Sequence, residues 1–242
     1  MTRRPREQPG GGPFHGVSAP VHTAFSLPIR TSFLLADPAS GSLLPEPSTL
    51  VEVRIGTLVA AFLFLSALAH LFIASPRVFD WYARNLRRGI NYARWIEYAA
   101  SASLMIVVIA MLVGIYDVAA LLALFALNAA MILFGLMMEL HNQATERTNW
   151  TAFWLGAGIG AVPWIAIAIY LFATPNVPTF VYWIYLSIFL FFNAFAVNMV
   201  LQYRRMGPWR DYLYGESAYI ILSLVAKSLL AWQVFAGTLR PV

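Results

Sequence analysis

The sequence has no cysteine and few charged residues. Without cysteine, the chain can form neither a disulfide framework nor a thiolate metal site. Only 11% of its 242 residues are charged, whereas an average soluble domain carries about 25%. Because 60% of the residues are hydrophobic, the composition indicates a membrane protein. The net charge of +5 comes from arginines grouped between apolar runs, a pattern typical of the flanks of membrane spans rather than of a nucleic-acid surface.

Apolar runs long enough to cross a bilayer occur six times in the sequence. A helix needs about 20 mostly apolar residues to span the hydrocarbon. Short connections with turn residues, such as TPNVPT and RRMGPW, separate the runs. We therefore predict a single all-α membrane domain over residues 1–242, in which residues 51–242 form six transmembrane helices. The predicted spans are roughly 52–75, 92–115, 117–140, 150–173, 178–203 and 213–238.

Arginines mark alternate connections between these spans. They occur in the connections at 76–91, 141–149 and 204–212, whereas the connections GIYDVA and TPNVPT have no basic residue. Because basic residues concentrate in cytoplasmic loops, we expect the three arginine-bearing connections on the cytoplasmic side. The chain is then a multi-pass protein of the cell membrane, in contact with lipid, and its C-terminus is extracellular.

The N-terminal residues 1–27 form a tail rich in arginine, glycine and proline. Six spans would place this tail outside the cell, although Arg3, Arg4 and Arg6 carry the charge expected on the cytoplasmic side. A seventh, preceding span would remove the conflict, but residues 14–28 are too short for one and contain two histidines. We therefore expect the first span to be degenerate or missing: either the genuine segment is lost from the start of the chain, or the protein has six helices.

Residues 28–50 differ from the apolar runs. The stretch RTSFLLA has strand character, DPASGS has turn chemistry, and LLPEP could pair back on the first stretch. We expect this extracellular loop to form a small β-hairpin.

Lys227 is the only lysine in the chain, and it lies in the middle of an apolar run, SLVAKSLLAW. It is eleven residues from both Glu216 and Thr238, which places it near the membrane midplane. A lysine at that depth costs about 2.5–3.5 kcal/mol on insertion, so it is a candidate functional residue. Two interpretations follow. The lysine is paired structurally with an acid inside the bundle, or its amine is kept dry so that it can form a Schiff base with a carbonyl compound.

A protonated Schiff base needs an anion nearby, and few acids lie within the spans. Glu97 lies about 9 Å inside the cytoplasmic start of its span, at about 1.5 Å per residue, and the lysine stem can cover much of the remaining distance. Glu139 lies only two residues from a loop and should be near the interface. We therefore predict Glu97 as the counterion. The alternative is that Glu97 pairs with Arg94, one turn earlier on the same helix.

Four further polar residues lie at related positions in the spans. His70 reaches the same ~9 Å depth as Glu97 and could hold or relay a proton near that carboxylate, although it could equally serve in helix packing. Ser223 lies one turn before the lysine and Ser101 one turn after Glu97, so each could hydrogen-bond the ion pair. Asn128 is polar near mid-span and must find a partner there.

Five motifs, in this order, resemble those of the heliorhodopsins, which are retinal-binding membrane proteins distantly related to the microbial rhodopsins. The similarity runs from about Leu27 to Val242. The orientation expected from the arginines agrees with the inverted orientation of that family. The motifs are RWIEYAASASLMIVVIAML (94–112), NAAMILFGLMMEL (128–140), IGAVPWIAIAIY (159–170), FLFFNAFA (189–196) and ESAYIILSLVAKSLLAWQVFAGTL (216–239).

The resemblance implies a rhodopsin-like seven-helix bundle, in which the first helix is here degenerate or missing. It implies that all-trans retinal is bound to Lys227 as a protonated Schiff base, with Glu97 as its counterion. Ser223 resembles the family's hydrogen-bonding partner of the Schiff base, and His70 resembles a member of a cytoplasmic polar cluster. The segment LPIRTSFLLADPASGSL resembles an outer loop that contributes to a homodimer. Residues in segments that wall the chromophore cavity or its neighbourhood are Asn128, Met131, Trp164, Phe192 and Asn193.

The leading functional interpretation is a light sensor that passes a change around the lysine to an unknown signalling partner, with no enzymatic activity. The family is generally described as not transporting ions, and the spans offer Glu97 and little else for an ion path. A light-driven ion (proton) transporter or channel is the first alternative. A non-photoactive membrane scaffold, with a merely paired lysine, is the second. Neither a metal site nor nucleic-acid binding is expected.

Overall fold

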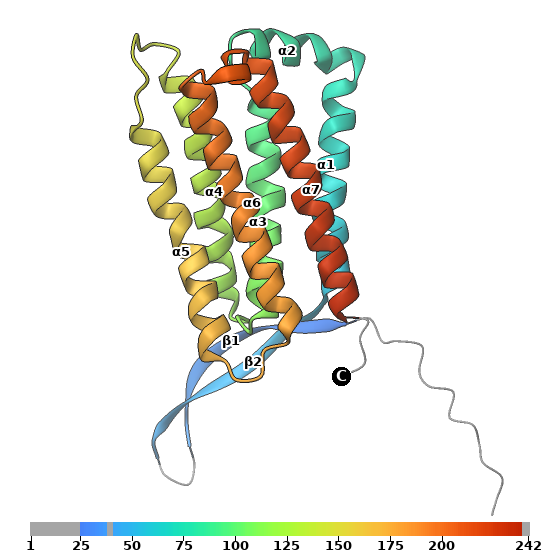
Figure 1. The fold of residues 1–242 in the computed structure, drawn as a ribbon. Coiled ribbons are helices and arrows are strands. Elements are labelled where there is room, and N and C mark those ends of the chain that lie inside the picture. The colour runs from blue at the N-terminus through green and yellow to red at the C-terminus, as the bar shows by residue number, and fades with distance from the viewer. Residues whose placement is uncertain (1–24, 38–40, 239–242) are drawn as a thin grey trace, which may run out of the picture.

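The computed structural model describes residues 25–37 and 41–238. Within these residues, six helices are long and apolar enough to cross a membrane, and Figure 1 shows them as a bundle. The prediction of an all-α membrane bundle with six clear spans is confirmed, and each helix begins and ends within a few residues of its expected limits. The candidate first span at 14–28 lies largely outside the described residues. The six helices are α1 (Ile55–Ala74), α3 (Tyr92–Leu112), α4 (Val118–His141), α5 (Thr151–Ala173), α6 (Thr179–Tyr203) and α7 (Tyr212–Thr238).

The predicted hairpin is present as two antiparallel strands, β1 (Ser26–Ala36) and β2 (Leu43–Arg54). It is longer than expected, because pairing continues to Ser26 opposite Arg54, so that α1 begins at Ile55 rather than at about residue 52. Arg30 N–H donates to the carbonyl oxygen of Tyr116 at 2.8 Å and so ties β1 to the α3–α4 connection. Figure 1 shows the hairpin running under one end of the bundle and projecting beyond it.

A seventh helix, α2 (Pro76–Arg87), lies in a segment that the sequence analysis treated only as a connection. Its sequence is too polar for a membrane span, so hydropathy does not detect it as a helix. Val78, Tyr82 and Leu86 nevertheless recur at helical spacing on its half-buried face. Proline at the first helical position suits a helix start. Figure 1 shows α2 lying across the end of the bundle opposite the hairpin. A short 3-10 helix, Gly207–Arg210, similarly interrupts the connection from α6 to α7.

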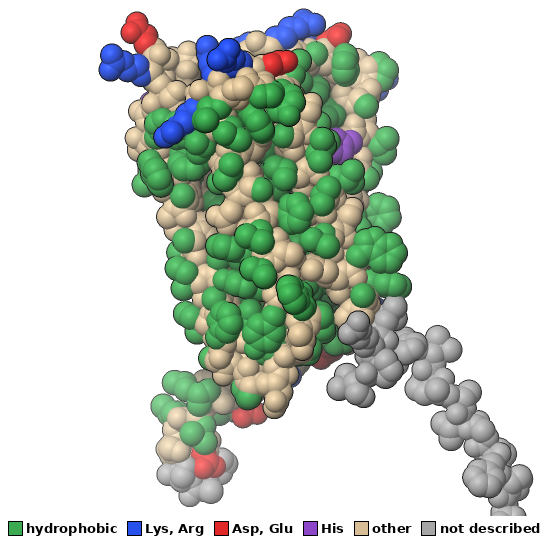
Figure 2. Space-filling view, in the orientation of Figure 1, with side chains coloured by type: hydrophobic (Ala, Val, Ile, Leu, Met, Phe, Trp, Pro, Cys, Tyr) green, Lys and Arg blue, Asp and Glu red, His purple; other side chains and the backbone are tan. Residues whose placement is uncertain are grey.

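Helix α3 lies at the centre of the bundle and is its most buried span. In an apolar stretch of 18 residues in α3, 56% of the stretch is buried. The corresponding value for α1 is 6%, which makes α1 the most exposed of the six long helices. Residues Met105 to Met111 of α3 form much of the main apolar core, together with side chains of α5, α6 and α7. Figure 2 shows an outer surface rich in apolar side chains, with the basic ones gathered at the α2 end. The central helix is therefore the element best placed to carry buried polar chemistry.

Candidate functional site

Lys227 is ion-paired with Glu97 inside the bundle. Its Nζ lies 2.7 Å from Glu97 Oε1, and the two side chains are only 6% and 8% exposed. Ser66 of α1 completes the group, since its hydroxyl accepts from Lys227 Nζ at 2.5 Å and donates to Glu97 Oε1 at 2.6 Å. The face of the Tyr98 ring lies 5.1 Å from the ammonium. Three helices therefore meet at one buried amine and one carboxylate.

The alternative partner considered for Glu97 is occupied elsewhere. Arg94 makes ion pairs with Glu139 at 2.6 Å and with Glu216 at 2.5 Å, and all three side chains are nearly inaccessible to solvent. Glu139 therefore lies in a separate ionic cluster and not beside Lys227. This geometry fits the expectation that Glu97, rather than Glu139, is the anion available to the lysine.

The Arg94 cluster is held by both aromatic and polar contacts. The guanidinium carbon of Arg94 lies 4.2 Å from the centre of the Trp95 ring and 3.9 Å from that of Tyr219. Trp95 Nε1 donates to Glu139 Oε2 at 2.7 Å, and Asn91 Nδ2 donates to Glu216 Oε2 at 2.7 Å. Each carboxylate thus accepts several hydrogen bonds, which compensate in part for its burial.

Removing the cation from this cluster is expected to destabilise the bundle strongly. Arg94→Met would leave Glu139 and Glu216 buried without their counter-charge, and breaking such a buried arrangement costs about 3–5 kcal/mol. The thermal unfolding midpoint in detergent, followed by tryptophan fluorescence, should fall well below that of wild type. Arg204→Met is the matched control, because Arg204 is exposed. Equal midpoints for the two variants would contradict a stabilising role of the cluster.

A small cavity lies between the two ionic groups. His70, Tyr82, Arg94 and Glu97 are among its lining residues. His70 thus shares a cavity with Glu97, as its depth suggested, but it is exposed and makes no hydrogen bond within the described part of the chain. Tyr82 belongs to α2, outside the spans, and its pKa is raised by burial and, further, by the negative charge of Glu216.

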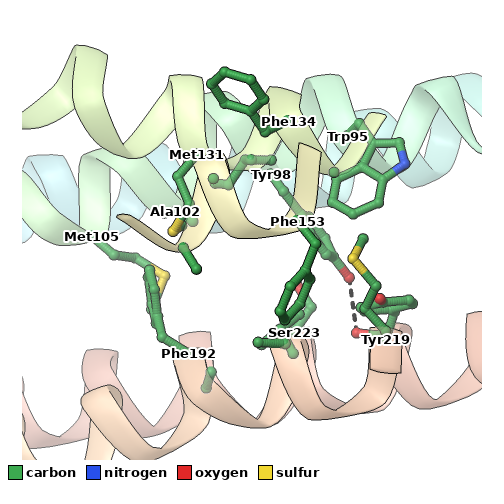
Figure 3. Close-up of a pocket in the computed structure, with 18 of the residues that line it drawn as sticks. Trp95, Tyr98, Ala102, Met105, Met131, Phe134, Phe153, Phe192, Tyr219 and Ser223 are labelled. Carbon is green, nitrogen blue, oxygen red and sulfur yellow. Dashed lines mark hydrogen bonds between the residues drawn. The ribbon is translucent and has the colours of Figure 1, made fainter. Parts of the chain in front are cut away.

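A larger cavity of ≈ 150 Å³ begins at Lys227 and is lined by side chains of five helices, α3 to α7. Its lining is mostly apolar and aromatic, as Figure 3 shows for Trp95, Phe153, Phe192 and their neighbours. The amine at one side of this space has the chemistry needed to attach an apolar aldehyde, and Glu97 supplies the balancing charge. The amine and the apolar, aromatic lining therefore have the chemistry needed to hold a conjugated carbonyl compound.

The other predicted site residues are distributed around this cavity. Ser223, Met131 and Phe192 line it. The Trp164 ring packs edge-on against Phe192, with centroids 5.2 Å apart, so it adjoins the lining without being part of it. Asn193 is exposed and donates to the Phe189 carbonyl oxygen at 2.8 Å.

Two predicted polar residues, Ser101 of α3 and Asn128 of α4, are buried without lining the cavity. Asn128 Nδ2 donates to Ser103 Oγ at 3.0 Å, so the amide near mid-span does find a partner. Ser101 is fully buried, and its hydroxyl makes no hydrogen bond to any described residue. Neither residue makes a hydrogen bond to Lys227 or Glu97.

Sequence reasoning missed several members of the site. Ser66 is one serine in an apolar run, and only its position four residues before His70 could have drawn attention to it. Tyr98 could have been found as the residue after Glu97. Arg94 and Glu216 lie near span ends and resembled ordinary boundary charges.

A buried lysine paired with a carboxylate lies beside an apolar cavity in this bundle of membrane helices, an arrangement consistent with a protein of the rhodopsin class. The family model for heliorhodopsin matches residues 16–239, and the chain belongs to the heliorhodopsin family. The match begins before Leu27, where the sequence analysis placed the start of the similarity. The family is one of retinal-binding, light-responsive membrane proteins. No curated protein has a significant sequence match to this chain.

Proposed function

We propose that this protein is a light sensor that holds all-trans retinal as a protonated Schiff base on Lys227, with Glu97 as the counterion. The observation that carries the proposal is the 2.7 Å contact between Lys227 Nζ and Glu97 Oε1 at the edge of the apolar cavity. An ion pair with a purely structural role would explain this contact, but only this contact. It would not explain why the lysine also lines a largely apolar cavity of ≈ 150 Å³.

The protein's own residues have three tasks in this proposal. The Lys227 amine would hold retinal by condensing with its aldehyde carbon, which would form a C=N bond and release one water. Glu97 stabilises the positive charge that remains on the nitrogen, because an opposite charge within ~4–6 Å favours the charged form. Ser66 lies within hydrogen-bonding distance of both groups and fixes their relative position. Retinal, when bound, supplies the light absorption and the isomerisation.

The placement of acids favours sensing over ion transport. Besides Glu97, the carboxylates within the described spans are Glu139 and Glu216, and both are paired with Arg94 near the α2 end of the bundle. Towards the hairpin end, the described spans carry no charged side chain beyond Lys227. A proton path needs a succession of such groups across the membrane. We therefore favour signalling over ion transport. The protein would signal through a partner yet to be identified, and we propose no enzymatic activity for it.

An absorption spectrum of the purified protein with added all-trans retinal tests the proposal most directly. A visible band that hydroxylamine bleaches is expected, because hydroxylamine attacks the carbon–nitrogen double bond. The absence of a visible band would favour a scaffold with a paired lysine. Light-dependent pH changes in vesicles containing the protein would favour a transporter.

The proposed orientation places the C-terminus outside the cell. Its support is the gathering of arginines at the α2 end, which the positive-inside rule assigns to the cytoplasm. A C-terminal epitope tag should therefore be accessible to antibody on intact cells, and a tag that is accessible only after permeabilisation would reverse the orientation.

We further propose that two copies associate through the hairpin. Its outer part exposes Phe33, Leu34 and Leu44, at 47%, 63% and 51% of their surface, and exposed apolar groups of this kind mark interaction surfaces. Leu34→Asp with Leu44→Asp should shift the protein from dimer to monomer in light scattering. An unchanged mass would contradict this interface.

The width of the cavity is expected to depend on Gly160. A Cβ at this position of α5 would overlap the Met131 side chain, which lines the cavity. Gly160→Ala should therefore push Met131 into the space for the chromophore and lower the pigment yield per milligram or shift the visible band. Gly158→Ala is the matched control, since a Cβ there meets nothing within 4 Å. Wild-type spectra and yields from both variants would contradict the assignment of the cavity.

A further inference from the structure

Helix α2 and the residue that follows it carry a row of arginines that form no ion pair within the described part of the chain. Arg77, Arg84, Arg87 and Arg88, here called the α2 arginine face, are exposed. Their guanidinium groups form no ion pair with any described residue, since the salt bridges within residues 25–37 and 41–238 all involve Arg94 or Lys227. Asp80 is the only acid on the helix. Asp80 lies on the same face, three residues after Arg77 and four residues before Arg84. Four arginines against one aspartate still leave the face with a net positive charge that can bind an anion.

The opposite face of α2 is fixed against the bundle. Asn85 is buried on this face. The Trp81 ring stacks on Tyr92 at the start of α3, with centroids 6.1 Å apart. Tyr82 lines the small cavity that Glu97 also lines. The arginines are thus carried on an element that does not depend on a partner for its position.

Two apolar side chains flank the arginine face. Phe79 is 53% exposed and Trp81 40% exposed, and at 100° per residue they project to opposite sides of the helix. The apolar helix α1 ends at Ala74, only two residues before α2 begins at Pro76. Figure 1 shows α2 turned across the bundle axis at that point. Aromatic side chains at this level suit the boundary between hydrocarbon and headgroups.

We propose that α2 lies in the headgroup layer and that the α2 arginine face binds the phosphates of anionic phospholipids. Guanidinium groups bind phosphate oxygens through two parallel charge-assisted hydrogen bonds. A cluster of four to eight basic residues on an amphipathic helix beside a span is the pattern expected for anionic lipid recognition. An acidic protein segment could match the charge, but it would not account for Phe79 and Trp81 exposed on either side at the depth of the interface.

Native mass spectrometry of the full chain in detergent tests the proposal. The probes are palmitoyl-oleoyl phosphatidylglycerol and the phosphatidylcholine with the same acyl chains, added in equal amounts. Wild type should retain the anionic lipid about tenfold more than the zwitterionic one. The variant with all four α2 arginines changed to glutamine should lose that preference. A variant with Arg204, Arg205 and Arg210 changed to glutamine, which removes exposed charge at the same end of the bundle, should keep it.

Several outcomes would overturn the proposal. One is equal retention of the two lipids by wild type, and another is an unchanged preference in the α2 variant. An equal loss in both variants would indicate general surface charge rather than a site on α2. Displacement of the lipid by an equal concentration of inorganic phosphate would indicate a free-anion site. The substituted side chains are exposed, so each variant should fold like wild type. Elution of each variant as a single species in gel filtration checks this.

Discussion

Replacing Lys227 with alanine or with arginine is expected to abolish the visible pigment. The chain has one lysine. Among the described residues that line the apolar cavity, no other side chain carries an amine. Alanine removes the nucleophile. Arginine keeps a positive charge beside Glu97, but a guanidinium does not form the carbon–nitrogen double bond with an aldehyde. The two variants therefore separate the covalent role of Lys227 from its role in the ion pair.

The measurement is the absorption spectrum after incubation with all-trans retinal and removal of the excess. Ser223→Ala is a suitable control, since Ser223 lines the same cavity one turn from the lysine but offers no amine. It should retain a visible band that hydroxylamine bleaches. A visible band that survives in either Lys227 variant would rule out attachment at this residue. Elution of the variants as single species in gel filtration excludes loss of pigment through misfolding.

Replacing Glu97 with glutamine should move the visible band to longer or markedly different wavelength. Glutamine has nearly the same shape but no charge, so the positive nitrogen loses an anion that in the structure lies 2.7 Å from the lysine amine. An opposite charge at such a distance shifts proton binding by about 1–3 pH units. The Schiff base of Glu97→Gln should accordingly lose its proton at a pH about 1–3 units lower than the Schiff base of wild type. A pH titration of the visible band measures the effect directly.

Glu139→Gln is the matched control for this substitution. Glu139 is also inaccessible to solvent, even more so than Glu97, but its partners are Arg94, Trp95 and Asn91. Its change should affect stability more than colour. If Glu139→Gln moved the band and the titration while Glu97→Gln did not, the counterion would have been assigned to the wrong helix. Ser66→Ala should give a smaller change than Glu97→Gln, because it removes a hydrogen bond and leaves the charge in place.

The sequence by itself determined the membrane architecture. A run of about 20 apolar residues has only one stable arrangement across hydrocarbon, a helix that satisfies its own backbone hydrogen bonds. For that reason the six spans could be predicted to within a few residues. The hairpin followed from strand-forming residues on either side of DPASGS, which is also a local signal. Lys227 and Glu97 could be singled out because charge within a span is rare and its depth can be counted along the chain.

The tertiary structure decided which side chains meet. Glu97 and Lys227 are 130 positions apart, and Arg94 is 122 positions from Glu216, so their contacts depend on how each helix is rotated about its own axis. Nothing in an apolar run fixes that rotation, since lipid and core favour the same side chains. Ser66 therefore could not be distinguished from other serines in the spans, nor could Asn193 be assigned to an exposed face. Helix α2 was decided in the same way, because its few apolar residues have a place to pack only once α1 and α3 lie side by side.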